Sequence, residues 1–426
     1  MLSYFRHYLA LALLLFSSSI VAVERWQVTG ITITGNKVTK ERLILQELDF
    51  VPGDVINKDA LERSRQSVMD LGLFEKVDAA VDDAGIVTIE IEEKSYVLLI
   101  PRISHDSEEN RLEPGLKLTV DNIAGLNQRL QVTYKQSKTQ EAIDGKQDEL
   151  SIGFSYPKVG GSQYNLQTNI DSRQGPIQRI NAGTVVSEYS KTSFGFTVLV
   201  TRWLVKIGPS KGWLSGFGIN FDKRDYSYTS GTVGAFDDDK AISMLAQINF
   251  TDVRNLLYSL EGVEYGYNLQ QGLEFLGSDY QFNRHLFYYR RYMQLHKKHH
   301  NLNFQARIGL SDGQSNNLDE GVYAIDGYGK LRGYRQEVEG DSYVLLNTEY
   351  LRPLFGRNHI RGLLFVDVGN AYAGNSDIDL TDLRWVAGSG IRWKIRKFVD
   401  FDLSLEVAYD FDNKDNKVYF KTGAAF

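Results

Sequence analysis

Hydrophobic and polar positions in the first quarter of the chain change their period twice. A strand-like alternation comes first, in which Val28, Ile31 and Ile33 are the apolar positions. Two helix-like stretches follow, and the second is bounded by Asn57 as a candidate N-cap and Gly72 as a candidate stop. Two more alternating stretches complete the segment. The pattern predicts a small α+β domain over 25–95 with the order strand, helix, helix, strand, strand, at residues 26–35, 39–48, 56–72, 73–81 and 85–94.

After Ser95 the helical period disappears. Alternating segments of about ten residues are separated by turns rich in Gly, Asn and Asp, which is typical of a transmembrane β-barrel. The segment 177–188 is ambiguous and is interpreted as loop or strand extension, because an even strand number is expected. We therefore predict a mainly β chain with a sixteen-stranded antiparallel barrel over 96–426, with strands near 96–104, 112–121, 129–138, 147–156, 162–173, 191–203, 213–226, 241–252, 258–268, 281–294, 301–310, 342–352, 360–370, 383–394, 401–411 and 417–426.

The connections between these strands alternate between long and short. If the first strand runs away from the N-terminal domain, the long connections fall on the far side and the short ones on the near side, as in bacterial outer-membrane barrels. A soluble barrel or sandwich gives no reason for such alternation. The far-side connections include 174–190, 227–240, 269–280 and 311–341, and the near-side turns include 157–161, 253–257, 295–300 and 353–359.

The N-terminus indicates export. A basic residue, Arg6, precedes an apolar run from Tyr8 to Phe16 and small residues up to Ala22. This layout predicts a secretory signal peptide over 1–22, because the run is far shorter than the roughly 20 residues of a spanning helix. The sequence has no cysteine, which excludes disulfides, thiolate zinc sites and cysteine nucleophiles.

Composition excludes several classes of function. The net charge is -6 and no basic block is long enough for a nucleic-acid stripe, so we expect no nucleic-acid partner. The stretch "HKKHH" at 296–300 has no acidic residue within it and is interpreted as a solvated turn, not a metal site. There is no nucleophile elbow or Walker loop. We expect a protein that is not an enzyme, has no catalytic residues and binds no cofactor or metal.

The N-terminal segment resembles a POTRA domain, the periplasmic module of the outer-membrane insertase and transporter superfamily. The resemblance rests on the order of elements, on "GN" after the first strand, on "PGD" before the second helix, and on "LGLFEKV" at its exit. It covers about 70 residues, and we find a single such unit in the sequence. A POTRA domain implies a periplasmic position in a Gram-negative bacterium.

The longest predicted connection, 311–341, contains the stretch "GYGKLRGYRQ" at 327–336. Leu331, Arg332, Gly333 and Tyr334 resemble the Val-Arg-Gly-Phe/Tyr motif of the superfamily that includes BamA- and TamA-like insertases, two-partner-secretion pores and bacterial surface antigen barrels. Leu331 in place of valine is a conservative departure. The resemblance implies an outer-membrane barrel with an extracellular loop folded into its lumen.

Two acidic residues are candidate partners of this arginine. Strand alternation places Glu349 and Asp367 on the lumen face, where a charge is tolerated, whereas at mid-depth on the lipid face it costs about 2 to 4 kcal/mol. A guanidinium has a planar fork of donors and can hold two carboxylates at once. The family resemblance implies that the motif arginine contacts an acid on each of these two strands.

The chain ends on an alternating strand, "KVYFKTGAAF", in which Phe420 and the terminal Phe426 share the lipid-facing side. This ending resembles the signal by which bacterial outer-membrane barrels are recognised for insertion. It implies the barrel-assembly machinery as a partner during the chain's own insertion, and outer-membrane lipid as its surroundings.

Two functions from different classes remain open at this stage. The resemblance implies a barrel that handles extended polypeptide clients from the periplasm, either assembling outer-membrane proteins or translocating a client through a gated lumen or seam. The alternative is a passive channel or structural surface antigen whose loop is a permanent plug. In the second case Arg332 only stabilises that plug. The client, protein or lipid, and the oligomeric state are left undetermined by these patterns.

Overall fold

The computed structural model describes residues 24–106, 111–138, 146–181, 184–234, 236–312, 323–325, 329–334 and 338–422. The predicted signal peptide, 1–22, and the terminal Phe426 lie outside these residues. Within them, no helix is long and apolar enough to cross a membrane.

The N-terminal domain packs two helices against a three-stranded sheet in the order β2-β5-β4, with β2 parallel to β5 and β4 antiparallel to it. Asn57 caps the longer helix through its side chain, which accepts a hydrogen bond from the N–H of Ala60 at 2.9 Å. Gly72 ends that helix with φ +75°, a conformation that favours glycine. The elements are β1 (Arg25–Gln27), β2 (Gly30–Thr34), α2 (Glu41–Leu45), β3 (Val55–Asn57), α3 (Lys58–Asp70), β4 (Phe74–Val81) and β5 (Ile86–Glu93).

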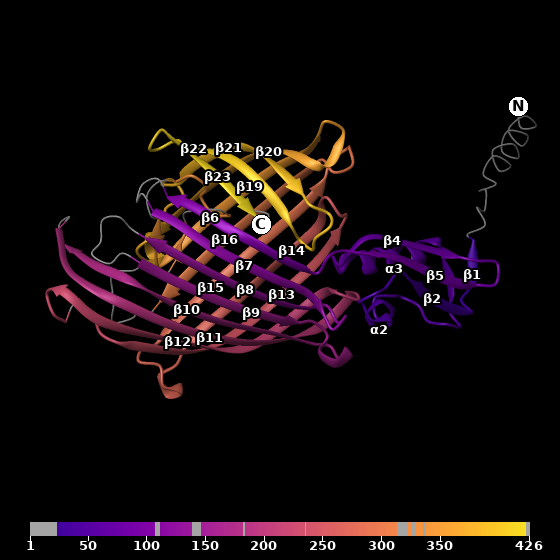
Figure 1. Ribbon diagram of the computed structural model, residues 1–426, viewed down its shortest axis with the longest axis horizontal. Coiled ribbons are helices and arrows are strands. Elements are labelled where there is room, and N and C mark those ends of the chain that lie inside the picture. Colours follow the sequence, from indigo (N-terminus) through magenta and orange to yellow (C-terminus); the bar gives the residue numbers. More distant parts are fainter. Residues whose placement is uncertain are drawn as a thin grey trace, which may run out of the picture.

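The rest of the chain forms one antiparallel sheet of sixteen strands, which Figure 1 shows curled round into a cylinder. The expected class, a mainly β chain with sixteen antiparallel strands after a small α+β domain, is confirmed. β6 and β23 are the two end strands of the sheet. The strands are β6 (Val97–Asp106), β7 (Arg111–Ile123), β8 (Gln128–Lys138), β9 (Lys146–Tyr156), β10 (Tyr164–Asn181), β11 (Thr184–Gly208), β12 (Lys211–Gly231), β13 (Asp239–Asn255), β14 (Leu260–Gly272), β15 (Phe282–Gln294), β16 (Asn301–Asp312), β19 (Ser342–Leu354), β20 (Arg357–Tyr372), β21 (Arg384–Lys394), β22 (Asp402–Asp410) and β23 (Asp415–Thr422).

One predicted connection is wrong in length. The far-side connection expected at 174–190 is mostly strand, because β10 extends to Asn181 and β11 starts at Thr184. The two strands stay paired along this stretch, with one register shift at Arg179/Ile180. The segment 177–188 is therefore a strand extension. β10 and β11 continue to pair after the alternation of hydrophobic and polar residues has ended. The end of that alternation therefore does not mark the end of a strand.

The two faces of the sheet differ as strand alternation predicts. On β20, Leu364 is 58% exposed, whereas its neighbour Phe365 is 3% exposed and Asp367 is fully buried. Alternate residues thus point to the outer surface and into the cylinder. This alternation places the charged and amide side chains of the C-terminal strands inside.

The N-terminal domain contacts the sheet at its near-side turns, at the right-hand end of the cylinder in Figure 1. Val399, from the β21–β22 turn, is 6% exposed and belongs to the same apolar cluster as Leu73 and Phe74 of the domain. Polar contacts reach four more turns. They join Lys40 N–H to the carbonyl of Gly125 (3.0 Å), Lys158 to Glu47, Lys211 to Asp70 (3.0 Å), and Gln66 to the carbonyl of Asn255 (2.9 Å).

Candidate functional site

Between β16 and β19, the described residues 323–325, 329–334 and 338–341 lie inside the cylinder, and Leu331, Arg332 and Gly333 pack against its inner wall. The short strands β17 (Tyr323–Ala324) and β18 (Glu339–Gly340) pair with each other, and the N–H of Leu331 donates to the carbonyl of Ile325 at 2.8 Å. Leu331 is fully buried, in one apolar cluster with wall residues of β19 to β22. This packing holds residues 329–334, the described part of the motif region, against the strands that carry the predicted acids.

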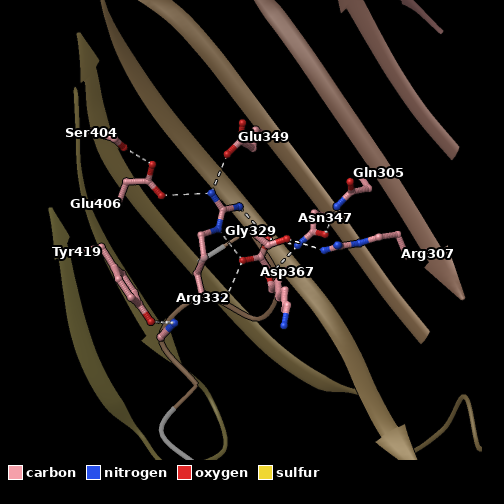
Figure 2. Close-up of polar contacts among 12 residues, drawn as sticks. Gln305, Arg307, Gly329, Arg332, Asn347, Glu349, Asp367, Ser404, Glu406 and Tyr419 are labelled. Atoms are coloured by element: carbon pink, nitrogen blue, oxygen red, sulfur yellow. Dashed lines mark hydrogen bonds and ion pairs between the residues drawn. The ribbon is translucent and has the colours of Figure 1, made fainter. Parts of the chain in front are cut away.

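Arg332 is fully buried and binds carboxylates from three strands, as Figure 2 shows. Its Nε and Nη2 donate to the two oxygens of Asp367 at 2.7 and 2.8 Å, which is the bidentate arrangement of an arginine and a carboxylate. Its Nη1 donates to Glu349 at 2.7 Å and to Glu406 at 3.2 Å. The guanidinium carbon also lies 3.6 Å from the ring centroid of Phe365. The structure thus brings Arg332, Glu349 and Asp367 together.

Sequence reasoning missed two members of this cluster, Glu406 and Arg392. Both are almost completely buried, and Arg392 donates to Glu349 at 3.1 Å and to Glu406 at 3.4 Å. Glu406 also accepts from the hydroxyl of Ser404. The signal was present in "DLSLEVAYD", where Ser404, Glu406 and Ala408 alternate with leucine and valine and so face inward.

The cluster contains three carboxylates, Asp367, Glu349 and Glu406, and two guanidiniums, Arg332 and Arg392. Removing one partner from a buried ion pair costs about 3 to 5 kcal/mol, because a charge is left unpaired away from water. The arginine therefore holds the segment strongly, and the wall carries a net negative charge in its absence.

Amide and arginine side chains also hold the backbone around Arg332. Asn347 donates to the carbonyl of Lys330 and to Asp367, both at 2.8 Å, and Gln305 donates to Asn347 at 3.0 Å. Arg307 donates to the carbonyl of Gly329 at 2.6 Å. These side chains lie beside Arg332 in Figure 2 and fix the main chain from β16 and β19.

Gly333 and Tyr334 continue the contact onto β22, β23 and the turn between them. The N–H of Gly333 donates to the hydroxyl of Tyr419 at 2.6 Å, and the hydroxyl of Tyr334 donates to Asp412 at 3.1 Å. Gly333 has φ +83°, and a Cβ added there would lie 2.5 Å from the Cβ of Ala408. Glycine is therefore needed for both its conformation and its close approach to the wall.

Gly333→Ala is expected to move the segment away from β22. The left-handed conformation costs roughly 1 to 2 kcal/mol for a non-glycine residue, and the clash with Ala408 adds to it. Single-channel conductance of the reconstituted protein should rise. The double variant Gly333→Ala with Ala408→Gly removes the clash but not the backbone strain, so partial recovery is expected. Full recovery would show that the conformation of Gly333 is unimportant.

The remaining predicted site residues concern the C-terminus. Phe420 is 65% exposed on β23, on the outer face with Val418. Phe426 lies outside the described residues, so the proposed insertion signal stays a prediction. Among the residues that the structure describes, no group of three or more His, Cys, Asp or Glu side chains is placed to hold a metal ion.

Comparisons with known proteins define the family. A model described as the Omp85 superfamily domain matches residues 122–426, and a POTRA model described as a surface antigen variable number repeat matches residues 27–94. The chain therefore belongs to the Omp85 superfamily and carries a POTRA domain before its β-sheet. It is an outer-membrane protein of the Gram-negative type with a periplasmic POTRA domain.

The similar proteins are only distantly related. The chain is 21% identical over 397 residues to the outer membrane protein assembly factor BamA of Nitratidesulfovibrio vulgaris, covering 86% of this chain and 47% of that protein. It thus spans about half the length of that relative. The fold resembles CdiB from Escherichia coli (TM-score 0.65, 13% identity, 93% of this chain and 76% of that one) and CdiB from Acinetobacter baumannii (TM-score 0.62, 13% identity, 93% and 73%).

Proposed function

We propose that this protein handles extended polypeptide clients at the outer membrane, either inserting them or translocating them. The POTRA domain receives the client by strand addition at an edge of its sheet, where β2 is an edge strand. The barrel then passes the client through its lumen or templates it at the seam between β6 and β23. Family membership and the assembly-factor relative support this class of function.

The observation that carries the proposal is how the lumen segment is held. Residues 329–334 are fixed by charge-assisted bonds from Arg332 to Asp367, Glu349 and Glu406 rather than by strand pairing with the barrel wall. Such contacts can be exchanged for water or for a client's polar groups without breaking any ladder of the sheet. A segment that must leave the lumen and return needs an attachment of this kind.

Depleting the protein is expected to change the outer membrane in one of two ways, measured by quantitative proteomics of membrane and medium. Loss of many barrel proteins from the membrane supports insertion, whereas loss of one large exported protein from the medium supports translocation. Complementation with wild type should restore the affected proteins, and Arg332→Ala should not. If neither fraction changes, the passive channel or structural surface antigen becomes the better explanation.

A further inference from the structure

Aromatic side chains form a row around one side of the barrel near its periplasmic end. Trp213, Phe250, Tyr265 and Tyr289 are directly opposed across β12, β13, β14 and β15. Successive ring centroids are 5.4, 5.1 and 6.4 Å apart. Tyr289 is 41% exposed on the outer surface. Such rows lie at the level of the lipid headgroups, so this one marks the periplasmic membrane interface.

Charged residues follow immediately on the same outer face, towards the periplasm. Alternation puts Asp252 and Arg254 below Phe250 on β13, and Arg291 below Tyr289 on β15. Arg254 is opposite Glu261 of β14 and binds it at 3.0 Å. Two residues along a strand correspond to roughly 7 Å, so these charges lie just past the aromatic row.

The POTRA helix α3 faces this charged rim and forms the second wall of a cleft of about 720 Å³. Its lining includes Asp59, Glu62 and Arg63 of the helix, and Asp252, Arg254 and Arg291 of the barrel. Ile207, 57% exposed, and Met293 provide apolar lining. The charged residues make both walls of the cleft polar. The apolar residues Ile207 and Met293 connect it to the lipid-facing surface of the barrel.

Two charged residues of the cleft are available to a ligand. In the described part of the chain, the side chains of Arg291 and Asp59 form no ion pair and no hydrogen bond, and they lie on opposite walls. Other charges of the cleft are already paired, such as Arg63 with Asp49 at 3.4 Å and Lys211 with Asp70 at 3.0 Å. An unpaired cation and an unpaired anion beside a lipid surface match a ligand that carries both charges.

We propose that this cleft binds the headgroup of a phospholipid of the inner leaflet, one that carries a phosphate and a primary ammonium group. The phosphate binds Arg291, the ammonium binds Asp59, and the acyl chains run up past Ile207 along the aromatic row. The lining has six carboxylates and four cationic side chains, which disfavours a purely anionic headgroup. A bound lipid touches both the POTRA domain and the barrel, and so strengthens their contact.

The test is native mass spectrometry of the full chain released from bilayers that contain equal parts of phosphatidylethanolamine, phosphatidylglycerol and phosphatidylcholine. Wild type should retain phosphatidylethanolamine preferentially. Arg291→Ala should reduce that retention roughly tenfold, as expected for one lost charge-assisted hydrogen bond. Asp59→Asn should mainly reduce the preference over phosphatidylcholine, whose ammonium has no N–H to donate.

Arg352→Ala is the matched control, because Arg352 is an exposed arginine at the periplasmic end of β19 and does not line the cleft. It should retain the lipid as wild type does, and heat-modifiable migration on gels checks that every variant is folded. The proposal is overturned if wild type shows no headgroup preference, if Arg291→Ala retains lipid normally, or if Arg352→Ala loses as much. A photo-cross-linker at position 63 that captures polypeptide and no lipid would also overturn it.

Discussion

Arg332→Ala is expected to release residues 329–334 from the lumen wall while the sixteen-stranded sheet stays folded. Three fully buried carboxylates would lose their shared cation, and Arg392 could pair only with Glu349 and Glu406. The cost is about 3 to 5 kcal/mol, which shifts the equilibrium between held and released segment by roughly 100- to 3,000-fold. Hydrogen exchange at Leu331 to Tyr334 should rise accordingly, and single-channel conductance should increase.

Arg332→Lys should resemble Arg332→Ala more than wild type. An ammonium is a point charge, so it cannot keep two bonds to Asp367 and one to Glu349 in a single plane. Arg224→Ala is the matched control. Arg224 also forms a largely buried pair, with Asp239 at 2.8 Å, but it has no contact with the motif segment. If Arg332→Ala and Arg224→Ala show the same hydrogen exchange and the same conductance, the packing of Leu331 and the hydrogen bonds from Asn347 and Arg307 hold the segment without the arginine.

The same variant separates the two proposed classes of function. A movable segment needs Arg332 for its return, so client insertion or translocation should fall together with the change in conductance. If the segment is a permanent plug, client handling does not depend on Arg332 and does not change together with conductance. Raised conductance with unchanged client handling would favour the passive channel.

Strand alternation predicted that Glu349 and Asp367 face inward, and the family resemblance selected them as partners of the arginine. Glu349 and Asp367 face inward because charged side chains on the opposite face would contact lipid, and the parity of each strand can be counted from its neighbours. Glu406 follows the same parity, but nothing in one sequence says which of several inward acids lies at the height of Arg332. The height of each inward-facing acid relative to Arg332 depends on the stagger between strands, which is set by strand pairing across the whole sheet.

The strand count was predictable for the same reason, whereas strand lengths and domain contacts were not. β10 and β11 extend beyond their predicted ends because each continues to pair with the other, a property of the pair and not of either segment. The position of Val399 in the core of the POTRA domain is also hidden in the sequence. A single valine in a periplasmic turn looks like any exposed turn residue until the two domains meet.

Lys158→Ala is expected to loosen the POTRA domain from the barrel. Glu47 of the domain is 1% exposed, binds Lys158 of the β9–β10 turn, and lies 3.4 Å from the hydroxyl of Ser210. Burial raises the pKa of the Glu47 carboxyl, and the charge of Lys158 opposes that rise. Without Lys158, the buried carboxylate of Glu47 either stays unpaired, takes up a proton or becomes exposed to water. It becomes exposed to water when the POTRA domain undocks from the barrel, so undocking is favoured.

Undocking is measured by hydrogen exchange in α2 and in the β9–β10 turn, and by protease access to residues 94–96 between the domains. A cost of about 3 to 5 kcal/mol predicts exchange faster by roughly 100- to 3,000-fold in those segments, with β12 to β15 unaffected. Glu47→Lys with Lys158→Glu should restore much of the protection, because the pair is remade with opposite polarity. Lys76→Ala, which removes an exposed pair with Asp78, should change little. Normal protection in Lys158→Ala would mean that the apolar contact of Val399 and the remaining turns fix the domain without this ion pair.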